Sequence, residues 1–98
     1  MNLQTTKLIS GIIREAIEKN NIITKINNIA KNDDLSFEIN GIAQQFENYE
    51  TSSNLAKLIS KTFNTSFEAE FIESEFVEAA KYIFKEAEKS GVILGSNI

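Results

Sequence analysis

Hydrophobic and polar residues recur with helical spacing along most of the chain, starting near its N-terminus. Over residues 7–19 the apolar side chains fall three and four positions apart, and the polar side chains fall on the opposite side. Thr5 or Thr6 precedes this stretch as a capping residue, and an Asn pair at 20–21 follows it as a stop signal. The pattern predicts a first amphipathic helix over residues 7–19.

Two shorter helices are expected next. Residues 22–31 carry a narrower, Asn-rich apolar stripe, and residues 35–48 follow the turn signal Asn-Asp-Asp at 32–34. Residues 35–39 also alternate between apolar and polar positions, so a short strand is the competing interpretation there.

The second half of the chain begins with a loop and another amphipathic segment. Ser52 or Ser53 is placed to cap a helix over residues 54–63, because a serine hydroxyl accepts a hydrogen bond from a free N–H of the first turn. The triplet Asn-Thr-Ser at 64–66 has the composition of a turn followed by a new cap. We expect the fourth helix to end there.

The last predicted helix is the longest. Residues 67–89 keep the helical spacing without a Pro, and the pair Ser-Gly at 90–91 is a typical stop. The tail over residues 92–98 is short and apolar, and we expect it either to dock as an extended segment or to fray. The chain therefore predicts an all-α fold: a compact bundle of four to five short amphipathic helices with a long C-terminal helix, in a single domain over residues 1–98.

A weak internal repeat is visible. The tetrapeptide Lys-Leu-Ile-Ser occurs at 7–10 and again at 57–60, and the same offset aligns other identical residues, such as Glu18 with Glu68. Two related helical hairpins would produce this agreement. Two unrelated amphipathic helices with the same biased amino-acid composition would produce it by chance. The sequence leaves both interpretations open.

The residues that the chain lacks exclude most catalytic chemistry. The chain has no His and no Cys, so the usual general base, the thiol nucleophile and the commonest ligands of transition metals are missing. Its four Gly residues are scattered and form no phosphate-binding loop. We therefore expect a protein that is not an enzyme and that uses no cofactor and no metal ion.

The charge is unevenly distributed along the chain. Residues 1–31 carry a net charge of +3, residues 32–98 carry −7, and the total is −4. An acidic excess disfavours nonspecific binding of nucleic acid, which requires that phosphates be neutralised. The same asymmetry would align two copies head to tail, or present an acidic face to a basic partner.

A helix-turn-helix motif is the main alternative to a protein-binding role. Residues 55–67 have part of its spacing, with the small residue Ala56 early and a turn expected near Asn64. The helix that would enter the DNA groove begins with several glutamates, which would repel the phosphates. A DNA-binding regulator is therefore kept as an alternative, while nucleic acid is not the expected partner.

The last predicted helix carries the best candidate contact surface. On a helical wheel two of its aromatic residues lie away from the main apolar face, among acidic side chains. Such a mixture is typical of protein-binding faces, whereas a small domain that wraps this helix on several sides would bury the same aromatics in its core. The candidate partner-binding residues are Glu68, Phe71, Glu75, Glu78 and Tyr82.

These observations favour a small acidic helical protein–protein interaction module. We expect an inhibitor or immunity-type protein whose acidic helix face binds and blocks a partner, and a partner with a basic nucleic-acid-binding surface would fit. An oligomeric structural or phage assembly subunit is the further alternative, and a homodimer or higher oligomer suits either role. The composition, rich in Ile, Asn and Lys, points to a bacterium, phage or plasmid. No membrane-spanning run and no secretory signal is visible, so the expected location is the cytoplasm.

Overall fold

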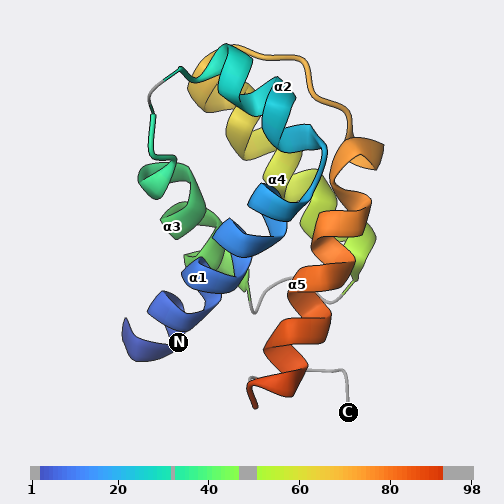
Figure 1. Cartoon of the computed structure of the whole chain (residues 1–98). Coiled ribbons are helices and arrows are strands. Elements are labelled where there is room, and N and C mark those ends of the chain that lie inside the picture. Colours follow the sequence, from blue (N-terminus) through green and yellow to red (C-terminus); the bar gives the residue numbers. More distant parts are fainter. Residues whose placement is uncertain (1–2, 32, 47–50, 92–98) are drawn as a thin grey trace.

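The computed structural model describes residues 3–31, 33–46 and 51–91, and every regular element among them is helical (Figure 1). The elements in chain order are α1 (Leu3–Lys19), α2 (Ile22–Ile29), α3 (Ser36–Gln45), α4 (Ser52–Phe67), the 3₁₀ helix η2 (Glu73–Phe76) and α5 (Val77–Lys89). The predicted all-α bundle with a long C-terminal helix is therefore confirmed. None of the described helices combines the length and the apolar character that crossing a bilayer requires.

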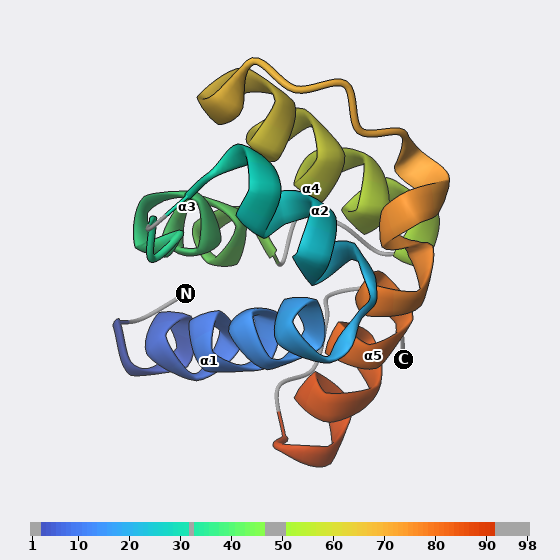
Figure 2. The same ribbon diagram turned by 45° about the horizontal axis from the view of Figure 1, so that its top comes forward.

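The helices enclose one core. Figure 2 shows α1 and α4 on opposite sides of the molecule, with α3 and α5 between them. α1 packs mainly against α3 and α5, and α4 packs against η2, α5 and α3. Each helix turns its apolar side inward, as the periodicity predicts. The largest fully buried side chains are those of Phe46, Phe63, Phe76, Ile9, Ile13, Ile17, Ile26, Ile39, Ile42, Leu55, Ile59 and Ile83.

An aromatic cluster joins α4 to the residues that follow it. The ring centroid of Phe63 lies 6.1 Å from that of Phe67, 6.4 Å from that of Phe71 and 5.9 Å from that of Phe76. Burial of one such ring contributes about 1.5–3 kcal/mol to folding. The cluster therefore anchors the segment after α4 to the body of the bundle.

The stop between α1 and α2 is confirmed, with a different cause from the one expected. The side-chain Oδ1 of Asn20 accepts a hydrogen bond from the N–H of Ile22 at 3.0 Å. Asn21 has right-handed helical backbone angles, so the left-handed conformation is not used. The Asn20 side chain ends α1 because its Oδ1 gives the N–H of Ile22 an acceptor other than a helical backbone carbonyl.

The start of α3 is set by the two aspartates before it. Asp33 Oδ1 accepts from the N–H of Leu35 at 2.7 Å, and Asp34 Oδ1 accepts from the N–H of Ser36 at 3.0 Å. α3 then runs to Gln45, so the strand alternative for residues 35–39 is wrong. Residues 47–48, which end the predicted helix, lie outside the described part of the chain.

α4 is longer than predicted at both ends. Thr51, not Ser52 or Ser53, caps it, because the Thr51 Oγ1 accepts from the N–H of Asn54 at 3.0 Å. The turn predicted at 64–66 is wrong, since these residues continue the helix to Phe67. The turn that a helix-turn-helix motif requires within residues 55–67 is therefore absent, because one continuous helix occupies that stretch.

The C-terminal helix begins later than residue 67. Residues 68–72, which we call the connector, are not helical, and η2 and α5 follow it. Glu68 ends α4 in the left-handed conformation, with φ of 52°. The Asn64 side chain then holds Phe71 at both backbone groups: its Oδ1 accepts from the Phe71 N–H at 2.7 Å, and its Nδ2 donates to the Phe71 carbonyl at 3.0 Å.

The two halves of the chain agree in part at the offset of 50. α1 and α4 correspond, and Ile13 and Phe63 are both fully buried at equivalent positions. A later equivalent pair differs, because Ile22 is buried and Ile72 is 61 % exposed. A common origin of the two halves stays a prediction. The expected behaviour of the tail at 92–98 concerns residues outside the described ones.

Candidate functional site

Phe71, one of the five predicted contact residues, belongs to the core. Its side chain is only 5 % exposed, and its ring packs edge-on against Phe63 and Phe76. The placement of Phe71 on an exposed helix face is therefore wrong. The reason is that the predicted helix is interrupted, so the connector turns this ring inward where a continuous helix would turn it outward.

Glu75 is engaged within the chain. Its carboxylate accepts from the Lys25 ammonium at 2.8 Å and from the N–H of Ile72 at 2.9 Å. These hydrogen bonds, that from Lys25 first, hold the pKa of Glu75 below its usual range. The Lys25 ammonium also lies 5.1 Å from the centre of the Phe71 ring. Glu75 thus ties α2 to the start of η2.

Tyr82 joins α5 to α1. Its hydroxyl donates to Glu15 Oε1 at 2.6 Å and accepts from the Lys19 ammonium at 3.3 Å. The hydrogen bond to Tyr82 lowers the pKa of Glu15, and the hydrogen bond to Glu15 raises the pKa of Tyr82. This cluster lies on the surface, but its polar groups already satisfy one another.

Glu68 and Glu78 are the predicted residues that remain exposed. Glu68 ends α4, and Glu78 lies in the first turn of α5, where its carboxylate is 3.5 Å from the Lys81 ammonium. The five predicted residues therefore come from the connector, η2 and α5 and do not share one helix face. Their role in partner binding stays a prediction.

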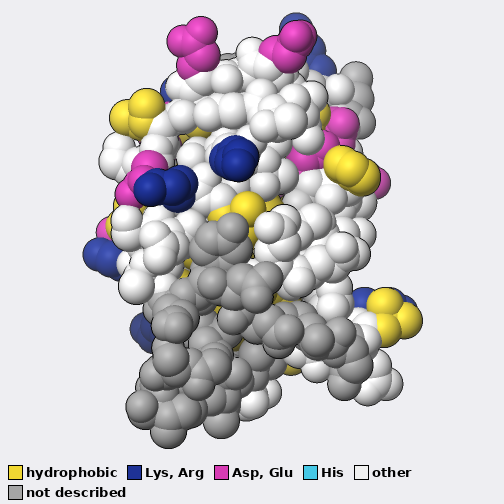
Figure 3. All heavy atoms as spheres, turned by 180° about the vertical axis from the view of Figure 1, so that it is seen from behind, with side chains coloured by type: hydrophobic (Ala, Val, Ile, Leu, Met, Phe, Trp, Pro, Cys, Tyr) yellow, Lys and Arg dark blue, Asp and Glu magenta, His cyan; other side chains and the backbone are white. Residues whose placement is uncertain are grey.

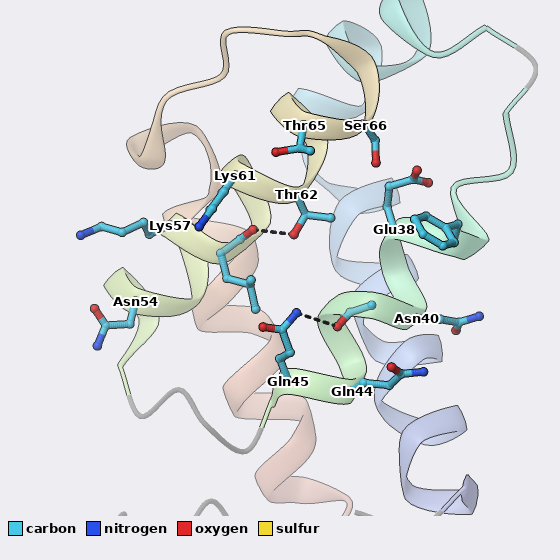
Figure 4. Close-up of a pocket in the computed structure, with 13 residues that line it drawn as sticks. Glu38, Asn40, Gln44, Gln45, Asn54, Lys57, Lys61, Thr62, Thr65 and Ser66 are labelled. Carbon is cyan, nitrogen blue, oxygen red and sulfur yellow. Dashed lines mark hydrogen bonds between the residues drawn. The ribbon is translucent and has the colours of Figure 1, made fainter.

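A groove lies between α3 and α4. It has a volume of about 800 Å³. Along α4 it extends from Asn54 to Ser66, which is about 18 Å at 1.5 Å per helical residue. Its α3 wall includes Phe37, Gly41 and Gln44. Figure 4 shows the two helices facing each other across it, with the Gln45 amide between them.

Two lysines form the outer rim of the groove. Lys57 and Lys61 lie one turn apart on α4, and Figure 4 shows both side chains leaving the helix on the side away from α3. Neither ammonium has a carboxylate partner among the described residues. Figure 3 views the molecule from behind: basic side chains lie near the middle of this face, and acidic ones gather towards its upper end.

Phe37 and Glu38 occupy the first turn of α3 at one end of the groove. The Phe37 side chain is 84 % exposed, whereas Glu38 is 6 % exposed. The Oε1 of Glu38 is buried and accepts no hydrogen bond. In Figure 4 the Glu38 side chain extends towards Thr65 and Ser66 at the far end of α4. A buried carboxylate oxygen that accepts no hydrogen bond lowers the stability of the fold.

The groove brings several kinds of polar and apolar group together. It offers ammonium groups, side-chain amides, an exposed ring and one unpaired carboxylate oxygen. One of its hydroxyls is already engaged, since Thr62 Oγ1 donates to the Leu58 carbonyl at 2.8 Å. Within the described part of the chain, no group of three or more acidic side chains is placed to hold a metal ion.

The sequence-based reasoning missed the groove. Its walls are the polar sides of two amphipathic helices, and such sides are normally solvated. The one available signal was Phe37, which falls on the polar side of residues 36–45 when they are read as a helix. The competing strand interpretation of that segment hid this exception.

Comparison of the chain with protein-family models, with curated proteins and with solved structures finds no match.

Proposed function

We propose that this protein acts by binding another protein chain, and that the groove between α3 and α4 is its contact site. The exposure of Phe37 carries the proposal. An aromatic ring that is 84 % exposed beside an open groove is the kind of side chain that dominates protein–protein contacts. Burying this ring in an interface would remove a large apolar area from water.

The other groups of the groove indicate the chemistry of the partner. Lys57 and Lys61 supply two positive charges that no described carboxylate pairs, so a segment with carboxylates is favoured. The length of about 18 Å accommodates roughly three turns of helix or five residues of extended chain. An acidic segment with one apolar anchor side chain therefore fits the groove.

The predicted role of binding a protein partner is kept, and the contact site is the groove between α3 and α4 in place of the acidic helix face. A small non-catalytic module that blocks or bridges a partner, as an inhibitor or immunity-type protein does, requires only a stable contact surface. The dispersal of Glu68, Phe71, Glu75, Glu78 and Tyr82 over several elements disfavours the acidic helix face as that surface. The groove gathers its binding groups within two neighbouring helices.

Site-specific photo-crosslinking tests the proposal. Phe37 is replaced by a benzoyl-phenylalanine, and the protein is irradiated in a lysate of the organism that encodes it. We expect one protein adduct, which the double substitution Lys57→Glu and Lys61→Glu abolishes. The same probe at Lys85, exposed on α5, is the matched control. No adduct at position 37, or an equal adduct from position 85, would contradict the proposal.

A further inference from the structure

We propose that the groove binds the connector, residues 68–72, of a second copy of this chain. The inference rests on the proposed function, because it names the occupant of the same groove. Its premise is that one chain carries two exposed surfaces of opposite charge, neither of which is paired with another of the described residues.

The connector presents a repeating exposed pattern. Glu68, Glu70 and Ile72 are exposed, while Ala69 and Phe71 between them turn towards the core. Glu68 and Glu70 have no basic partner among the described residues. The connector therefore offers two free carboxylates and one apolar side chain along a short stretch of chain.

The spacing of these groups matches the groove. Glu68 and Glu70 are two residues apart on a non-helical segment, so their Cα atoms can be separated by up to about 7 Å. Lys57 and Lys61 are four residues apart on a helix, which is about 6 Å along its axis. The flexible lysine stems let both ammonium groups turn over the groove. Ile72, two residues beyond Glu70, would then reach the end of the groove where Phe37 is exposed.

The connector is held in shape before it binds. Asn64 fixes both backbone groups of Phe71, and Glu75 accepts from the N–H of Ile72. These clamps keep the connector away from the groove of its own chain, so a second copy must supply the occupant. They also reduce the ordering cost of association.

In the described part of the chain, the connector also keeps one backbone donor unpaired. The N–H groups of Glu68 and Ala69 donate to the Asn64 carbonyl, and those of Phe71 and Ile72 are also paired. Among the described residues, the N–H of Glu70 has no acceptor. The connector therefore presents one free backbone donor beside its two exposed carboxylates.

The contact joins different surfaces of the two copies. Two copies that exchange connectors reciprocally form a closed dimer, whereas a one-way contact continues from copy to copy until it closes into a ring or remains open. The location of the connector directly after α4, whose side forms one wall of the groove, brings both surfaces to the same region of the molecule.

Charge exchange between two variants tests the inference by analytical ultracentrifugation at low salt, over roughly 10–500 µM protein. The wild-type mass is expected to rise with concentration. Lys57→Glu with Lys61→Glu, and Glu68→Lys with Glu70→Lys, should each weaken association about tenfold or more. An equimolar mixture of the two variants should associate again, because the altered groove now matches the altered connector.

Two further variants separate this contact from general charge effects. Lys81→Glu with Lys85→Glu changes the net charge equally, at the same spacing, on α5, and should associate as the wild type does. Gly41→Leu should prevent association without altering charge, because an added Cβ at Gly41 meets open space while the side chain fills the groove. Circular dichroism confirms that each variant is folded.

The outcomes distinguish this inference from the proposed function. A monomeric wild type at every concentration, no recovery in the mixture, or an equal loss in the α5 control would overturn the second copy as occupant. If a groove-dependent adduct to a different protein then persists at position 37, the proposed function stands with another occupant. If that adduct is absent too, both ideas fail.

Discussion

The Asn64 side chain is expected to contribute measurably to stability, because it holds the connector against α4. Replacement of Asn64 by Ala removes its hydrogen bonds to the N–H and the carbonyl of Phe71. Each hydrogen bond contributes about 0.5–1.5 kcal/mol, so the loss is about 1–3 kcal/mol. Alanine also favours the helix by up to about 0.7 kcal/mol, which partly offsets this loss.

A control variant removes the effect of helix propensity. Thr65 is the exposed neighbour of Asn64 on α4, and Thr and Asn have similar helix propensities. The free energy of unfolding of Asn64→Ala should therefore lie about 1–3 kcal/mol below that of Thr65→Ala. Asn64→Leu, which fills a similar volume without the hydrogen bonds, should lose a comparable amount.

Urea denaturation provides the measurement. With a slope of about 1.5 kcal/mol per molar urea, the midpoint of Asn64→Ala should fall by roughly 0.7–2 M relative to the control. Amide hydrogen exchange at Phe71 should accelerate in the same variant, since its N–H loses its acceptor. A difference from Thr65→Ala below about 0.3 kcal/mol would refute the clamp, because that difference lies within the error of additivity.

Three other substitutions test separate features of the structure. Glu68→Gly should raise the free energy of unfolding by about 0.5–1 kcal/mol, because glycine adopts the left-handed conformation without a steric cost; an unchanged urea midpoint would argue against that geometry. Gly41→Ala should raise the free energy of unfolding by about 0.5–1 kcal/mol in the same assay, since alanine favours the helix and its added Cβ meets open space. Destabilisation would show that other atoms occupy the space beside Gly41. Glu75→Gln should be less stable than the wild type at about pH 6, because Lys25 and the Ile72 N–H stabilise the ionised carboxylate and so lower the pKa of Glu75. The wild type loses this stabilisation as the pH falls through the lowered pKa. The gap between the two proteins should therefore shrink at about pH 3, and a constant gap would contradict the assignment.

The helices were predictable from the sequence because their apolar positions repeat with helical spacing. The break after α4 was not, because no Gly or Pro marks it. It depends on Glu68 adopting the left-handed conformation and on Asn64 pairing with the backbone of Phe71, seven residues away. A helical wheel assumes that the helix continues, so it placed Phe71 on the surface and joined Glu75 and Tyr82 into one face.

The groove was unpredictable for a different reason. Its binding groups lie on the polar sides of α3 and α4, and nothing in a linear pattern states that two such sides will face each other. The exposed ring of Phe37 and the buried carboxylate of Glu38 break the expected distribution in opposite directions within one helical turn. Local departures of this kind are where function is expected to override local preference.

The most direct test of the groove as a contact site is a dilution series followed by amide chemical shifts in nuclear magnetic resonance spectra. As the concentration rises, we expect shifts confined to the groove, around Phe37, Lys57 and Lys61, and to the connector at 68–72. The amides around Lys85 on α5 should stay unchanged. Concentration-dependent shifts confined to α5, or no shifts at any concentration, would contradict the account of how this chain associates.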